Sequence, residues 1–395
     1  MKKSIETKKK FNYVFLFCAG SFAVNLYVAQ MSPLAIQIMG KFGISDGQYT
    51  SLYMSNLLPS LFLGIPSAWL VRRFGLKMCQ CVGILIGLAG LILRLSDVYW
   101  IFYIGTLIIG AANVVVSTMA AATFSGLFKK ENVGIAVGCL IAAGAAGKAL
   151  AESTTSLFPS FEVMSAVDII LQIIVLLAWL TMMDGFEYSD TEAAFSKTFV
   201  TVLRNKYIWI GALALMLVFG LYTGISAHLP TILQEKGYYL VSAGFIASFI
   251  SIGYFAGAVF LPKLATKIWR KKLFMVALAL ISSLFTAFAY WVQQEALLTV
   301  SIFVIGACVG GLLPLSIAIP ASVLNFGVQE SQAAGPVLTA FQLAGAVLIP
   351  TYIIVPLAGG NILGFLGYAA VFMIVEAMLF TLLPKNRKHF SDKNQ

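Results

Sequence analysis

The sequence predicts an all-α membrane protein whose twelve transmembrane helices form two pseudo-symmetric halves of six helices each. Three observations lead to this prediction: the apolar composition, the length of the apolar segments, and a repeat between the two parts of the chain. Of the 395 residues, 60% are hydrophobic and only 11% are charged, whereas a soluble domain carries about 25% charged residues. A soluble chain of this composition would lack a polar surface, so lipid must be its solvent.

The apolar segments are long enough to cross a bilayer as helices, which takes about 20 apolar residues each. They are too evenly apolar for barrel strands, which alternate between apolar and polar residues. Inside lipid, the backbone polar groups must then be satisfied within helices. In chain order, the expected spans cover residues 11–38, 48–71, 78–95, 100–126, 133–157, 163–183, 207–233, 242–265, 273–292, 297–321, 331–357 and 364–383.

The basic residues predict the orientation in the membrane. If the N-terminus is cytoplasmic, 22 of the 26 lysines and arginines fall in segments on that side. This asymmetry places both termini in the cytoplasm and favours an even number of spans. It also accounts for the net charge of +10 without nucleic acid as a partner. We therefore expect a multi-pass protein of the cytoplasmic (inner) membrane, present in the lipid bilayer as a monomer.

A repeat at an offset of about 196 residues divides the chain in two. Ser32-Pro33-Leu34 in the first part corresponds to Leu229-Pro230-Thr231 in the second. A constant offset of this kind predicts an N-terminal half at 1–183, a cytoplasmic linker at 184–206, and a C-terminal half with a short cytoplasmic tail at 207–395. Chance matches among Gly, Ser and Pro in apolar sequence are the alternative explanation.

Two six-span halves in the same orientation, joined by a polar linker, resemble the major facilitator superfamily. In the loop after the second span, Arg73, Gly75 and Lys77 match the basic loop motif of that family, whereas Ala68 and Arg72 replace its usual Gly and Asp. The resemblance implies a secondary transporter that works by alternating access, with its substrate at the midplane between the halves. It also implies a cytoplasmic gating loop that contains Arg72, Arg73, Gly75 and Lys77. A basic membrane anchor is the alternative role for this loop.

Neighbouring segments are similar to the cyanate-permease branch of the superfamily. The likeness lies in Ser55 to Pro66, with the sequence SNLLPSLFLGIP, and in Leu229 to Gly237, with the sequence LPTILQEKG. Members of that branch often have Asn-x-Arg in the first span, where this chain has Asn25-Leu26-Tyr27. The Tyr in place of the Arg argues against cyanate itself as the substrate.

One stripe of the fifth expected span carries two charges, which are costly inside a membrane and mark functional sites by default. Gly144, Lys148, Glu152 and Ser156 lie four residues apart, a spacing that places them along one side of a helix. Lys148 is predicted to attract an anionic substrate near mid-span. Glu152 is predicted to pair with Lys148 and either to hold it in place or to exchange a proton. A structural ion pair that locks helices together is the alternative.

Other polar side chains are further candidates for the substrate site. Asn25, Asn113 and Tyr222 lie in the first, fourth and seventh spans, which line the cavity in the family that the chain resembles, and Gln342 lies in the eleventh. Interhelical hydrogen bonds are the alternative role for each of them. His228, near the outer end of the seventh span, is a second candidate for proton coupling or else a histidine at the membrane–water interface.

These patterns predict secondary active transport of a small anionic solute, with a proton as a candidate co-substrate. Efflux of amphipathic drugs is the main alternative, and a channel or a membrane sensor is a further one. The chain has no Gly-x-x-x-x-Gly-Lys-Ser/Thr loop for ATP hydrolysis. It also has no nucleophile–base constellation and only two histidines, so we expect no enzymatic activity, no metal site and no cofactor.

Overall fold

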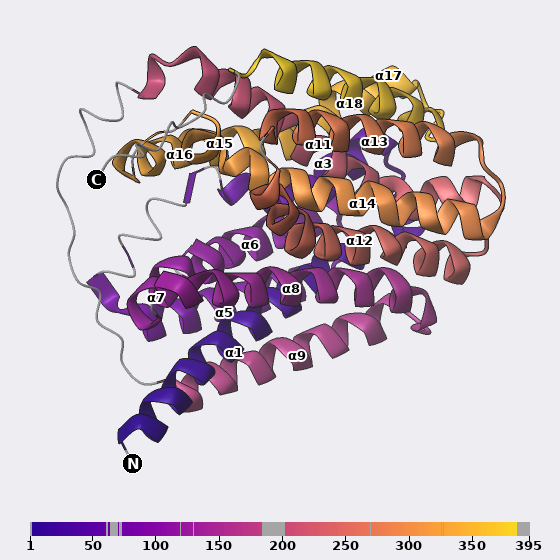
Figure 1. Cartoon of the computed structure of the whole chain (residues 1–395). Coiled ribbons are helices and arrows are strands. Elements are labelled where there is room, and N and C mark those ends of the chain that lie inside the picture. Colours follow the sequence, from indigo (N-terminus) through magenta and orange to yellow (C-terminus); the bar gives the residue numbers. More distant parts are fainter. Residues whose placement is uncertain are drawn as a thin grey trace, which may run out of the picture.

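The computed structural model describes residues 2–60, 62–63, 70, 73–118, 120–128, 130–183, 202–268, 270–324, 326 and 328–384. These residues form helices joined by short turns, and the described chain contains no strand. The helices lie roughly side by side in one bundle (Figure 1).

The helices before residue 184 are called the first group, and those after residue 201 the second group. The first group contains α1 (Lys2–Ala29), α2 (Ala35–Phe42), α3 (Asp46–Met54), η1 (Ser55–Leu57), α5 (Leu76–Leu93), α6 (Tyr99–Thr118), α7 (Ala120–Leu127), α8 (Lys130–Thr154), η2 (Thr155–Leu157) and α9 (Phe161–Met182). The second contains α11 (Lys206–Glu235), α12 (Leu240–Lys267), α13 (Lys271–Trp291), α14 (Glu295–Ile317), α15 (Ile319–Ser322), α16 (Val328–Leu348), η3 (Ile349–Ile354), α17 (Val355–Ala358) and α18 (Gly364–Leu382).

The bundle has two ends, which we name from the course of the chain. The basal end holds the start of α1 and the link between α7 and α8, and it lies to the left in Figure 1. The distal end holds the turns at 30–34, 94–98, 158–160 and 236–239. Each long helix runs between these two ends.

Nine helices of the described chain are long and apolar enough to cross a membrane, which identifies a multi-pass membrane protein. Three expected spans, at 48–71, 100–126 and 133–157, are not among the nine. The first includes residues outside the described ranges, and in the second only Tyr99–Val114 of α6 forms a shorter apolar helix. In the third, the side chains of residues 131–135 and 137 lie outside the described residues, and the remainder of α8 is too short to count and contains Lys148 and Glu152. The total of twelve spans therefore stays a prediction.

The packing of the second group resembles that of the first. In the first group, α1 packs on α8, and α5 packs on α6 and α9; in the second, α11 packs on α16, and α13 packs on α14 and α18. Lys77 at the start of α5 donates to the carbonyls of Leu180 and Met183, at 2.8 and 3.0 Å. Lys272 at the start of α13 donates to the carbonyl of Leu383, at 2.6 Å. Both lysines thus satisfy carbonyls that lack a donor at a helix end.

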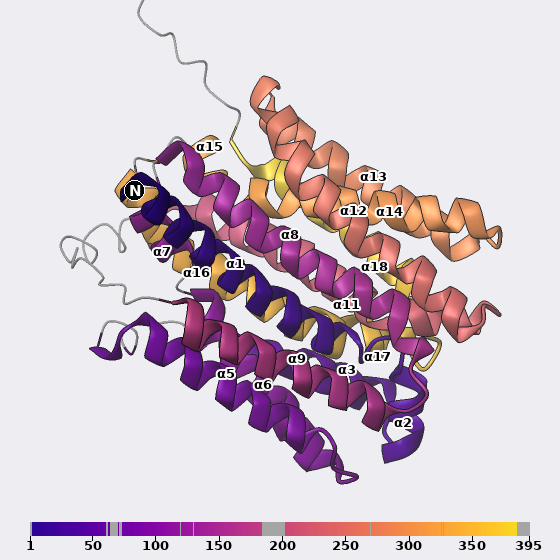
Figure 2. The ribbon, with the colours of Figure 1, turned by 90° about the horizontal axis from the view of Figure 1, so that it is seen from below.

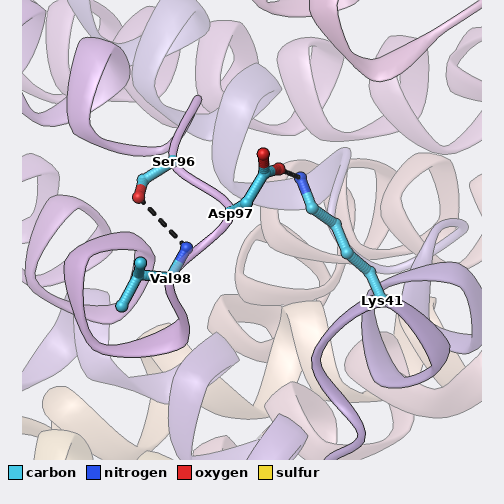
Figure 3. Close-up of polar contacts among 4 residues, drawn as sticks. All are labelled: Lys41, Ser96, Asp97 and Val98. Atoms are coloured by element: carbon cyan, nitrogen blue, oxygen red, sulfur yellow. Dashed lines mark hydrogen bonds and ion pairs between the residues drawn. The ribbon is translucent and has the colours of Figure 1, made fainter.

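The distal turns of the first group are fixed by polar contacts. The Lys41 ammonium lies 2.7 Å from a carboxylate oxygen of Asp97, which joins the end of α2 to the turn before α6 (Figure 3). In the same turn, the Ser96 hydroxyl accepts a hydrogen bond from the Val98 amide, at 3.1 Å. The ion pair is exposed to solvent, so its contribution to stability is small.

Arg94, at the distal end of α5, is buried, and only 2% of it is exposed. Its guanidinium donates to the carbonyl of Tyr27, at 2.9 Å, and lies over the ring of Phe102. On the adjacent helix α9, Asp168 is also buried and accepts a hydrogen bond from Gln30, at 3.0 Å. Arg94 is therefore a structural residue that ties the end of α5 to the end of α1.

Candidate functional site

Lys148 lies where the two groups of helices meet. It belongs to α8, and its ammonium lies 5.4 Å from the centre of the Tyr222 ring on α11. Tyr222 is buried and stacks on Tyr254 of α12, with ring centres 4.8 Å apart and planes at 21°. A cation above an aromatic face is attracted by the negative charge density of the ring. The first group thus supplies the charge, and the second group supplies the aromatic surface that receives it.

Glu152 lies one helical turn beyond Lys148 toward the distal end and is fully buried. One carboxylate oxygen accepts a hydrogen bond from the Ser226 hydroxyl of α11, at 3.2 Å, and the other from the Ser251 hydroxyl of α12, at 2.9 Å. Its hydrogen-bond partners therefore come from the second group, although the residue itself belongs to the first.

The predicted pairing of Lys148 with Glu152 does not take the form of a direct salt bridge between described atoms. Lys148 faces the Tyr222 ring, whereas the carboxylate of Glu152 accepts hydrogen bonds from the two serines. Residues four apart on a helix can meet, but here each side chain makes its direct contact on another helix. The two opposite charges still attract each other electrostatically across one helical turn.

Small residues bring these helices close enough for such contacts. In α8, a Cβ on Gly147 would collide with the carbonyl of Phe22 in α1, and one on Gly144 would press against Asn25. In α12, a Cβ on Gly244 would collide with the carbonyl of Glu152. Glycines of this kind let helix backbones approach in a membrane. As a result, α8 lies between α1 and α12 (Figure 2).

The remaining candidates for the substrate site are less closely connected. Asn25 packs against α8 beside Gly144, but its amide donates to the carbonyl of Ser21 in its own helix, at 2.8 Å. Asn113 and Gln342 are half-buried in α6 and α16. No described hydrogen bond joins Asn113 or Gln342 to Lys148, so the structure brings together Lys148, Glu152 and Tyr222 with Asn25 at the edge.

His228 is buried inside the protein near the distal end of α11. Only 1% of it is exposed. Its Nε2 atom lies 2.8 Å from the Thr50 hydroxyl of α3, and its ring packs against Tyr49 and Phe365. It therefore forms part of the contact between the two groups near the distal end.

The predicted gating loop is only partly described. Arg72 lies outside the described residues. Arg73 is exposed and lies over the ring of Phe74, at 5.4 Å. Gly75 has a φ of +84°, which favours glycine, and it precedes α5. Lys77 caps the end of α9, as described above, so within the described residues its role is structural.

Sequence reasoning missed the residues that complete the site, namely Ser226, Ser251 and Tyr254. Serine is common in apolar helices, and no spacing links Ser226 or Ser251 to a carboxylate 74 or 99 residues away. The only feature of the sequence that pointed to these residues was their location on α11 and α12, in the second half of the repeat. Within the described residues, no group of three or more His, Cys, Asp or Glu side chains could hold a metal ion.

Comparison with known proteins gives three kinds of match. The family model described as "Major Facilitator Superfamily" matches residues 14–350. A curated protein of Archaeoglobus fulgidus, described as uncharacterized, is 24% identical over 153 residues, which cover 39% of this chain and 70% of that protein.

Among solved structures, the fold is similar to a D-xylose–proton symporter, with a TM-score of 0.75 at 13% identity over 96% of this chain and 99% of that one. It is also similar to a bacterial homologue of the human lysosomal transporter Spinster, solved in an inward-facing and unoccupied conformation. That match has a TM-score of 0.71 at 12% identity and covers 95% of this chain and 98% of the other.

Proposed function

Because the chain belongs to the major facilitator superfamily, it is a transporter and not an enzyme, and we propose that it is a secondary carrier of a small anion that binds at Lys148. The observation that carries the proposal is a half-buried ammonium, between the two groups, whose partner is a ring and not a carboxylate. An arriving anion can exchange this weak contact for a charge-assisted hydrogen bond, which is about twice as strong as a neutral one. One chain supplies every residue of this site, which supports a monomer as the transport unit.

The two groups act as the two halves of an alternating-access carrier in this proposal, with the linker at 184–206 between them. Hydrogen bonds that join the two groups lie at Glu152 and, closer to the distal end, at Ser32 and Thr50. This arrangement supports a state that is closed at the distal end. The similarity to a structure described as inward-facing supports the same assignment.

The basic residues support a cytoplasmic basal end in the inner membrane, with both termini on that side. Cysteines introduced for Arg270, which is exposed at the basal end, and for Tyr239, which is 85% exposed at the distal end, test this orientation. In intact cells, a membrane-impermeant maleimide should label Tyr239→Cys above the background of the unsubstituted protein. Arg270→Cys should be labelled only after the cells are opened. The reverse pattern would contradict the proposed orientation.

Glu152 is proposed to couple anion movement to a proton. Its carboxylate is held by Ser226 and Ser251 of the second group. Opening the distal end pulls these donors away, and the charged carboxylate then loses the two hydrogen bonds that stabilise it. Protonation removes that cost, so the distal-open state favours protonated Glu152. An anion on Lys148 also disfavours a second negative charge one turn away.

Anion binding and protonation therefore favour each other, which is the thermodynamic requirement for symport. Uptake of a panel of labelled small anions into proteoliposomes, with and without a pH gradient, tests this proposal directly. We expect at least one anion to accumulate, and to accumulate more when the distal side is acidic. Transport of amphipathic cations instead, unchanged in Lys148→Ala, would favour drug efflux over anion transport.

A further inference from the structure

A proline in α11 leaves a backbone carbonyl without a donor at the contact between the two groups. Pro230 lies inside this helix and has no N–H, so it cannot donate to the carbonyl of Ser226 four residues earlier. In an apolar setting, a carbonyl that loses its helical donor needs another one. The sequence of α11 therefore creates an acceptor at this level of the helix.

The donor comes from the other group. The Ser32 hydroxyl, in the turn after α1, lies 2.7 Å from the Ser226 carbonyl oxygen and 2.9 Å from that of Ala227. Ser32 is completely buried and Ser226 is 1% exposed, so water does not compete for either group. Ser32 itself precedes Pro33, which occupies the repeat position of Pro230. The contact thus joins the turn that contains Pro33 to the segment just before Pro230.

A second contact of the same kind lies nearby. The Thr50 hydroxyl donates its single proton to the Asp46 carbonyl of its own helix, at 2.6 Å. Its oxygen therefore accepts from His228, which must carry a proton on Nε2 to donate across the 2.8 Å gap. Both contacts join segment 32–50 of the first group to segment 226–228 of the second.

We propose that Ser32 and the carbonyl freed by Pro230 form the latch that closes the distal gate of the transport cycle, with Thr50 and His228 as a second, weaker fastening. Closing satisfies the Ser226 carbonyl with Ser32, and opening requires water to replace that donor. Because Pro230 cannot donate to the Ser226 carbonyl within α11, that carbonyl stays available to accept from Ser32 of the opposite half. The inference rests on alternating access but not on the identity of the substrate.

Hydrogen–deuterium exchange of the whole protein in nanodiscs, followed at the amides of residues 34–50, tests the latch without any substrate. Ser32→Ala removes the donor. Pro230→Ala restores an N–H that can bond to Ser226 within α11 and so competes with Ser32. Because one net hydrogen bond shifts an opening equilibrium by about five- to tenfold, each variant should exchange about five- to tenfold faster in this segment.

Matched controls separate the latch from general loosening. Pro262→Ala changes a proline inside α12, and Ser21→Ala removes a serine that bonds within the first group, to Leu140; neither should accelerate exchange at 34–50. The double variant of Ser32 and Pro230 should exchange no faster than the faster single variant, since both changes remove the same bond. Pro230→Ala should also melt at or above the temperature of the unsubstituted protein, which shows that the helix remains intact.

Three results would overturn the proposal. The first is exchange at 34–50 that is unchanged in both Ser32→Ala and Pro230→Ala. The second is an equal acceleration in Pro262→Ala, and the third is an additive effect in the double variant. None of these results depends on whether an anion is transported, so the latch and the proposed function fail independently.

Discussion

Lys148→Ala is expected to lower anion uptake into proteoliposomes by about 10- to 150-fold while the protein remains folded in the membrane. A hydrogen bond to a charged group contributes about 1.5–3 kcal/mol, and the substituted site would offer the anion only neutral groups. Folding should survive because the buried carboxylate of Glu152, although it loses the nearby positive charge of Lys148, remains hydrogen-bonded. Glu152 keeps both of its serine donors, and the contact with the Tyr222 ring is lost.

Two further variants sharpen this prediction. Lys148→Arg should retain partial uptake, since the charge remains but its shape and hydrogen-bond geometry change. Lys41→Ala removes a lysine whose ion pair is exposed at the distal end, and uptake should stay within about twofold of the unsubstituted protein because such pairs contribute little. Initial rates of labelled anion uptake, normalised to the amount of reconstituted protein, provide the measurement.

A purely structural role for the two charges makes a different prediction. If Lys148 and Glu152 served only to neutralise each other, the double variant Lys148→Ala with Glu152→Gln would fold and transport normally. Normal transport by that variant would rule out Lys148 as the contact for the anion. The direct contacts of the two side chains differ, because Lys148 faces a ring and Glu152 accepts from two serines of the other group, and these contacts motivate separate roles.

The sequence identified the charged residues of the site but not their partners. Four-residue spacing placed Lys148 and Glu152 on consecutive turns of one helix, and α8 contains both. The partners Tyr222, Ser226 and Ser251 lie on helices that pack against α8 only in the folded chain. A helical pattern reports which residues share a face, but it does not report which helix covers that face.

Burial was the other property that sequence patterns could not supply. Arg94 and His228 lie at or near the ends of apolar segments, where a polar side chain could face water. Both are almost completely buried, because Arg94 donates to the Tyr27 carbonyl and His228 contacts the Thr50 hydroxyl. A polar group enters an apolar interior when a partner compensates its lost hydration. The partner is a tertiary feature and leaves no local signal.

The repeat also indicated which positions of the two parts of the chain correspond to each other. It aligned the start of α5 with the start of α13, and in both places a lysine caps the last helix of its group, through Lys77 and Lys272. It also aligned Pro33 with Pro230. The two groups also differ in their polar residues. Lys148 and Glu152 lie on α8 of the first group, and the Ser226 carbonyl of α11 in the second group accepts from Ser32.

Glu152→Gln is expected to abolish the stimulation of anion uptake by a pH gradient while anion binding persists. The glutamine side chain is neutral and keeps one carbonyl oxygen to accept from Ser226 or Ser251, so it imitates the protonated carboxyl group. Lys148 remains in place to attract the anion. The ratio of uptake with an acidic distal side to uptake without a gradient should therefore fall to about one, and the proton influx that accompanies uptake should disappear.

Glu162→Gln is the matched control, because Glu162 is an exposed carboxylate at the start of α9 and should keep the full ratio. Binding of the anion, measured as thermal stabilisation of the purified protein, should remain in Glu152→Gln and be lost in Lys148→Ala. This contrast assigns the anion to one residue and the proton to the other. If Glu152→Gln retained the full response to the gradient, the proton would have to travel with another group, and the coupling of distal opening to the charge on Glu152 would be wrong.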